Sequence, residues 1–66
     1  MTIIINGDSK EIPSGLNLEG VLDFFSLPSK RIAVELNKTV IPRREWETTV
    51  IAESDKIEVI HFVGGG

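Results

Sequence analysis

The sequence predicts a two-layer α+β fold in which one main helix covers a single mixed sheet. Three observations support this prediction. Short β-branched or alternating segments recur along the chain, and only one segment has the apolar spacing of an amphipathic helix. The chain has 66 residues, of which 41% are hydrophobic, and this is enough for one core but not for two.

The first expected element is a β-hairpin. Residues 2–6 form a β-branched run that is typical of a strand buried on at least one face. Residues 6–8, Asn-Gly-Asp, are a hairpin-turn signal, because Asn and Gly adopt positive φ at low cost. Residues 10–12 can return as a second, partly exposed strand, which Pro13 ends because proline cannot donate to the ladder.

One amphipathic helix is expected after the hairpin. Asn17 is placed to cap it, because its side-chain oxygen can accept a hydrogen bond from a free backbone N–H. Gly20 weakens the helix by about 1 kcal/mol relative to alanine, so the helix depends on tertiary packing. Pro28 closes the segment. The apolar stripe recurs at i, i+3, i+4 and i+7 and consists of Leu18, Val21, Leu22 and Phe25.

Two further strands are expected in the second half of the chain. Residues 31–37 alternate with one apolar face, and a turn at 37–38 leads into a short strand over 39–41. Residues 43–47 are polar around one large side chain and fit a short helical turn or an ordered loop. We expect that side chain, Trp46, to anchor the core.

The last strand is expected over 56–63. One of its faces carries Ile57 and Val59, and the other carries Glu58, Ile60 and Phe62. If the helix covers the first face, Ile60 and Phe62 form an apolar patch beside the C-terminal residues. This patch is equally compatible with a docking surface for a partner and with an incompletely polar sheet surface.

This order of two strands, a helix, two strands, a turn and a last strand matches the β-grasp, or ubiquitin-like, arrangement. In that arrangement the first and last strands lie side by side in parallel at the centre of the sheet. The sequence therefore predicts a β-grasp domain over residues 1–63, followed by a flexible Gly-Gly-Gly tail over 64–66.

Composition argues against several classes of function. Seven Lys+Arg against ten Asp+Glu give a net charge of −3, so we expect neither a nucleic acid nor a membrane as partner. The chain has no cysteine and a single histidine, so we expect no metal site. That histidine, His61, lies in no nucleophile motif, and we expect no catalytic residue. The absence of a membrane-spanning run and of a signal-peptide pattern favours a cytoplasmic location.

The C-terminal glycines have two interpretations, a frayed or engineered end and a working tail. Glycine has no Cβ, so Gly64 and Gly65 could thread a narrow channel in a partner's active site. Three extended residues reach about 10 Å, which would bring the α-carboxylate of Gly66 to the partner's reacting groups. This carboxylate is ionised at neutral pH and needs activation before acyl chemistry. The chain has no P-loop, so we expect that it binds no cofactor. We also expect that a partner enzyme uses ATP to activate the carboxylate.

Several motifs in the second half carry a family resemblance. They are Val34-Glu35-Leu36-Asn37, Val40-Ile41-Pro42-Arg43 followed by Trp46, Thr49, Asp55, Ile57-Glu58-Val59 and Val63-Gly64-Gly65-Gly66. With Asn6-Gly7 and the Leu18…Leu22 stripe, they cover essentially the whole chain, which resembles the ThiS family of sulfur carrier proteins in thiamin biosynthesis. One departure is Ser54, which stands where the family usually has glycine before the aspartate.

The resemblance implies a carrier rather than an enzyme. It implies that an E1-like enzyme adenylates Gly66 with ATP, and that sulfur from a donor such as a cysteine desulfurase converts the adenylate to a thiocarboxylate. The thiocarboxylate then gives its sulfur to thiazole synthase. The absence of cysteine agrees with this, because the chain cannot carry sulfur as a persulfide. We expect the free protein to be a monomer.

Three other functions remain open from the sequence. One is the small subunit of molybdopterin synthase, which resembles this chain in its Gly-Gly end and its carrier chemistry. Another is a ubiquitin-like modifier joined to lysines of other proteins. The last is an interaction module with an inert tail.

Overall fold

The computed structural model describes residues 1–27 and 30–62. In chain order the elements are β1 (Thr2–Ile5), β2 (Asp8–Glu11), α1 (Leu18–Phe24), β3 (Ile32–Leu36), β4 (Thr39–Val40), the 3-10 helix η1 (Arg43–Glu45) and β5 (Lys56–His61). Within the described ranges, no helix has the length and apolar character needed to cross a membrane.

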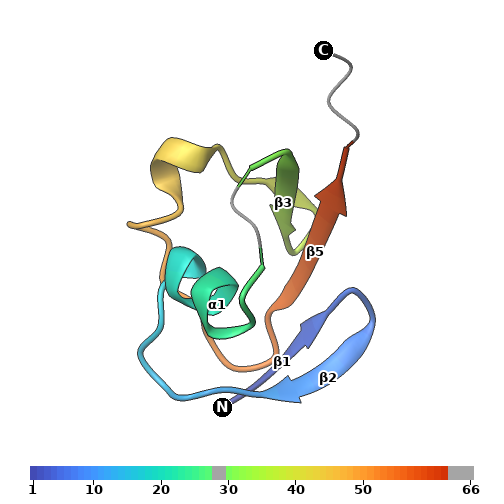
Figure 1. Ribbon diagram of the computed structural model, residues 1–66. Helices are drawn as coiled ribbons and strands as arrows, with labels where there is room; N and C mark the ends of the chain where they lie inside the picture. The colour runs from blue at the N-terminus through green and yellow to red at the C-terminus, as the bar shows by residue number, and fades with distance from the viewer. Residues whose placement is uncertain (28–29, 63–66) are drawn as a thin grey trace.

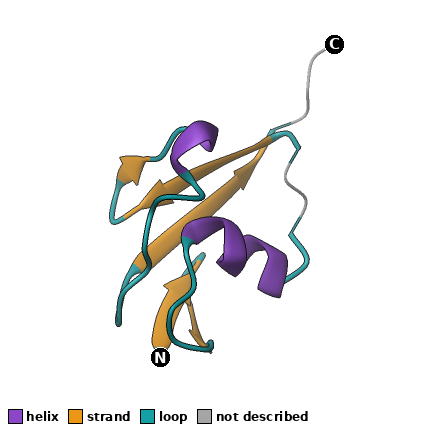
Figure 2. Ribbon diagram, turned by 90° about the vertical axis from the view of Figure 1, so that its left-hand side faces the viewer, coloured by secondary structure: helices purple, strands orange, loops and turns teal. Residues whose placement is uncertain are grey.

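The strands form one mixed sheet in the order β2-β1-β5-β3-β4, and α1 lies across one of its faces (Figures 1 and 2). The first and last strands, β1 and β5, pair in parallel inside the sheet. The three other pairs, β1–β2, β3–β4 and β3–β5, are antiparallel. This topology confirms the predicted α+β, β-grasp fold.

Both hairpins close through two residues in the left-handed region. Asn6 and Gly7 connect β1 to β2 with φ values of 48° and 84°. Asn37 and Lys38 connect β3 to β4 with φ values of 50° and 72°. Two-residue loops with positive φ at both positions match the right-handed twist of the flanking strands. The Asn-Gly signal therefore predicted the first turn correctly, and Asn37 supports the second one in the same way.

The N-cap of α1 agrees with the sequence, whereas the helix ends before the predicted boundary at Pro28. Asn17 Oδ1 accepts a hydrogen bond from the Gly20 backbone N–H at 2.7 Å, which confirms the predicted N-cap. A Cβ on Gly20 would lie 3.1 Å from this oxygen, so glycine leaves room for the cap. The helix ends at Phe24 and leaves Phe25 as its C-cap, because Ser26 has a φ of 54°, outside the helical range.

The strands β1 to β4 all end earlier than the sequence predicts, and β2 also begins two residues earlier, at Asp8. β1 stops at Ile5, because Asn6 has a φ of 48°. β2 stops before Ile12, whose side chain turns into the core and is 5% exposed.

β4 stops before Ile41, which packs against the core while its N–H donates to the Val34 carbonyl at 2.9 Å. β3 lacks the predicted ends Arg31 and Asn37, because their φ values of 60° and 50° depart from extended backbone.

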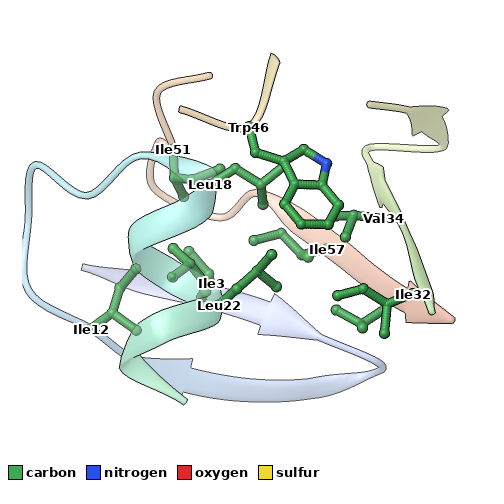
Figure 3. Close-up of a cluster of buried hydrophobic side chains, with 11 residues drawn as sticks. Ile3, Ile12, Leu18, Leu22, Ile32, Val34, Trp46, Ile51 and Ile57 are labelled. Atoms are coloured by element: carbon green, nitrogen blue, oxygen red, sulfur yellow. The ribbon is translucent and has the colours of Figure 1, made fainter. Parts of the chain in front are cut away.

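The core lies between α1 and the sheet (Figure 3). Its buried side chains are Ile3, Ile12, Leu18, Val21, Leu22, Ile32, Val34, Trp46, Ile51, Ile57 and Val59. The predicted helix stripe supplies three of them, Leu18, Val21 and Leu22, whereas Phe25 packs at the edge and is partly buried.

Trp46 closes the core next to η1, as the sequence predicts. Its side chain is 3% exposed, and its indole Nε1–H donates to the Ile41 carbonyl at 2.9 Å. The Arg43 guanidinium lies 4.7 Å from the centre of the ring. The segment 43–47 is therefore an ordered turn held by the indole.

Candidate functional site

β5 carries the chain toward its C-terminal residues, and it is held on both sides. Its pairing with β3 extends to His61, and beyond it the Phe62 N–H donates to the Arg31 carbonyl at 3.0 Å. Its pairing with β1 includes only Lys56 and Ile57. β5 runs to the end of the molecule opposite the N-terminus (Figure 1).

Asn6 extends the hydrogen bonding between β1 and β5 past the end of the β1 strand. Its backbone N–H donates to the Ile57 carbonyl at 2.9 Å, and its Oδ1 accepts from the Val59 N–H at 2.8 Å. The side-chain oxygen thus takes the place of the next backbone acceptor in the ladder. Asn6 therefore belongs to the first hairpin turn and also fixes the middle of β5.

A small hydrogen-bond network fixes the start of β5. Asn37 Oδ1 accepts from the Lys56 N–H at 3.0 Å, and Asn37 Nδ2 donates to Asp55 Oδ1 at 3.0 Å. Asp55 Oδ2 in turn accepts from the Ala52 N–H at 2.7 Å. Ser54 has a φ of 67°, so the position where this chain departs from the ThiS pattern is one that favours glycine.

The two faces of β5 divide as the sequence predicts. Ile57 and Val59 are buried, at 1% and 6% exposure, on the face that α1 covers. Ile60 and Phe62 are 46% and 52% exposed, and they lie with Glu58 on the opposite, outer face. The exposure of the predicted patch is confirmed, whereas its role in docking stays a prediction.

The strand register adds two residues to this face that sequence reasoning missed. Glu35 of β3 lies directly opposite Glu58, and Val40 of β4 lies directly opposite Glu35. Val40 is 61% exposed and Glu35 is partly exposed. We call the group Glu35, Val40, Glu58, Ile60 and Phe62 the outer patch. The outer patch forms only because three strands pair in this register, and no local sequence motif predicts that pairing.

The predicted reacting group and its threading residues lie outside the described residues. Gly64, Gly65 and Gly66 belong to this undescribed end, as does Val63, the last residue of the strand predicted over 56–63. The described strand ends two residues earlier, at His61. Phe62, with its N–H on the Arg31 carbonyl, is the last described residue before these glycines.

His61 is exposed and pairs with Ile32 through the backbone at the end of β5. In residues 1–27 and 30–62, no three His, Asp or Glu side chains lie close enough to hold a metal ion. Two further exposed apolar side chains, Phe24 and Val50 at 51% and 74% exposure, lie outside the outer patch and were not predicted as a surface.

Comparisons with known proteins place this geometry in a family. The ThiS family profile matches residues 3–66. A thiazole synthase from Magnetococcus marinus is 41% identical over 66 residues, which are 100% of this chain and 20% of that protein. The chain therefore spans about a fifth of the length of this relative.

Relatives that are closer to this chain in length are also ThiS proteins. The sulfur carrier protein ThiS of Bacillus subtilis is 35% identical over 49 residues, 74% of each chain. The crystal structure of the thiamine biosynthesis protein ThiS from Geobacter metallireducens superposes with a TM-score of 0.88 at 28% identity and covers 100% of both chains. These matches confirm the resemblance found in the sequence, and the chain belongs to the ThiS family.

Proposed function

We propose that this chain is a sulfur carrier protein for thiazole formation in thiamin biosynthesis and that the carboxylate of Gly66 carries the sulfur. The observation that carries the first part is the likeness, over its whole length, to a ThiS structure of the same extent. The second part rests on the sequence, which supplies no cysteine as another attachment point.

The proposed chemistry has two steps, both at Gly66. The carboxylate attacks the α-phosphorus of ATP in an E1-like partner enzyme, which forms the acyl adenylate and releases pyrophosphate. Sulfur at the oxidation level of sulfide then attacks the acyl carbon and displaces AMP, which leaves the thiocarboxylate. Activation is required because an ionised carboxylate is a poor electrophile. A cysteine desulfurase or a comparable source would supply this sulfur as a persulfide, and a second thiol would then release it at the sulfide level by attacking the inner sulfur and forming a disulfide.

Thiazole synthase is the proposed acceptor. In the relative from Magnetococcus marinus, a segment similar to this entire chain belongs to a protein named thiazole synthase. A carrier and its acceptor that occur in one polypeptide meet at high effective concentration. The same two components, as separate chains, need a surface that brings them together. In this chain we assign that role to the exposed Ile60 and Phe62, which lie next to the undescribed C-terminal residues.

Intact-protein mass spectrometry tests the carrier role. The chain is incubated with an E1-like activating enzyme, ATP and a sulfur donor, and a second sample contains a variant without Gly66. We expect the full chain to gain the mass of one oxygen-to-sulfur exchange and the shortened variant to show no such gain. If neither an adenylate nor an exchange forms on the full chain, the proposed function is wrong.

A further inference from the structure

The outer patch contains two carboxylates that face each other across neighbouring strands. Glu35 and Glu58 are register partners in the antiparallel pair β3–β5. In such a pair the Cβ atoms lie about 5 Å apart, and like charges placed directly opposite each other destabilise the sheet. The pairing that builds the fold therefore keeps two negative charges together.

No cation of the described chain forms an ion pair with either of these carboxylates. Among residues 1–27 and 30–62 the one ion pair joins Arg44 and Glu45 at 3.8 Å, in the η1 region. Lys56 lies two residues before Glu58 on the same strand, and its register partner in β1 is Ile4. The carboxylates of Glu35 and Glu58 are therefore open to a positive group from outside the described residues.

Exposed apolar side chains flank the two carboxylates. Val40, 61% exposed, lies beside Glu35 on β4, and Ile60, 46% exposed, lies two residues beyond Glu58 on β5. An arginine side chain matches this combination, because its guanidinium bonds carboxylates through several N–H groups while its methylene stem packs on apolar surface. Lysine supplies a more compact and more strongly hydrated charge, which fits the apolar flanks less well.

We infer that the outer patch docks thiazole synthase and that an arginine of that enzyme contacts both Glu35 and Glu58. This inference rests on the proposed function. One observation selects the occupant, and another selects the place where it docks. A segment similar to this whole chain belongs to a thiazole synthase in Magnetococcus marinus. Phe62 lies in the same patch, and the four residues after it span at most about 14 Å, so an enzyme that receives Gly66 must approach this end of the sheet.

Calorimetric titration of the full chain with thiazole synthase tests the inference. The variants are Glu35→Gln, Glu58→Gln and the double variant, and Glu47→Gln is the matched control. Glu47 is exposed outside the outer patch, and its substitution changes the net charge by the same amount as each single variant. We expect the double variant to raise the Kd about tenfold or more and the control less than about twofold. The affinity of the double variant should also depend less on salt.

Thermal unfolding of the same proteins excludes loss of fold as the explanation. The double variant removes a repulsion, so we expect its Tm to equal or exceed that of the unchanged chain. Weaker binding together with a lower Tm would overturn the inference, because the glutamates would then support the fold. Equal affinity of the double variant and the Glu47→Gln control would overturn it too, as would a lack of binding by the unchanged chain.

Two parallel measurements separate this inference from the function on which it rests. The unchanged chain is assayed for the oxygen-to-sulfur exchange. If the exchange occurs, but substitution of the two glutamates does not change the affinity for thiazole synthase, the carrier role stands and the docking inference is wrong. The double variant is also titrated with the activating enzyme. If its affinity falls there and not with thiazole synthase, the patch docks the activating enzyme and the inference is wrong about the occupant.

Discussion

The two faces of β5 differ in what they contact, although they belong to one strand of six residues. On the inner face, Ile57 and Val59 are buried beneath α1. On the outer face, Glu58 lies opposite another glutamate, and Ile60 is 46% exposed. The inner face has the composition of a core, whereas the outer face combines charge with exposed apolar surface.

If the outer face docks a partner as proposed, this difference separates stability from recognition within a very small domain. A chain of 66 residues has about 3–10 kcal/mol of folding stability, so it can spare few side chains from its core. Alternation along a strand solves this problem, because residues one position apart point to opposite sides of the sheet. Substitutions on the two faces should therefore have separable effects.

The largest expected effect comes from the inner face. Ile57→Ala should lower the free energy of unfolding by about 2–5 kcal/mol, because it leaves a cavity where the side chain is 1% exposed. Ile60→Ala is the matched control, with the same residue type on the same strand, and it should cost less than about 1 kcal/mol. Urea denaturation measures both. If Ile57→Ala does not fold, Ile57→Val should still cost about 1 kcal/mol. Equal losses at both positions would contradict the division between faces.

The outer face should show the opposite behaviour. Removing both Ile60 and Phe62 side chains, as Ile60→Ala with Phe62→Ala, should weaken binding to thiazole synthase by about 2 kcal/mol, the range of interface hot spots. The loss of stability should stay small because both residues are about half exposed. Titration with the enzyme measures the first effect and urea denaturation the second. Full affinity in this variant would show that the exposed side chains are ordinary sheet surface.

Local patterns in the sequence predict most of the core that α1 and the inner face of β5 form. Spacing i, i+3, i+4 selects the buried Leu18, Val21 and Leu22, and alternation selects Ile57 and Val59. These side chains are predictable because burial depends mainly on the period of a single element. The ends of strands are harder to predict: β3 loses Arg31 to a positive φ that no local motif signals.

The outer patch is only half predictable, for a different physical reason. Ile60 and Phe62 follow from the alternation of one strand, but Glu35 and Val40 join them only through the registers β3–β5 and β3–β4. A register depends on how separate segments pair, and a shift of one residue would turn each of these side chains to the other face. The three glycines lie outside the described residues, so their role stays a prediction.

A smaller effect is expected at Asn6, which holds β5 to β1. Asn6→Gly keeps the positive φ of the turn but removes the Oδ1 that accepts the Val59 N–H, so it should cost about 1–2 kcal/mol. Lys38→Gly is the control at the equivalent type of turn position, with a φ of 72°, and it should change stability by less than about 0.5 kcal/mol. Hydrogen exchange at the Val59 amide should increase in Asn6→Gly alone. Unchanged protection of this amide would contradict the assigned role of the side chain.

The smallest expected effect has the opposite sign and lies in the turn before β5. Ser54 has a φ of 67°, which costs a residue with a Cβ about 1 kcal/mol, so Ser54→Gly relieves strain. Greater freedom of glycine in the unfolded chain offsets part of this gain, and a net stabilisation of about 0.5 kcal/mol remains. The Ser54 N–H that donates to the Thr2 carbonyl at 2.7 Å is kept in the variant. Chemical denaturation should show this gain without a change in affinity for thiazole synthase, because the turn lies outside the outer patch. A loss of stability would mean that the serine side chain supports the turn more than the strained backbone weakens it.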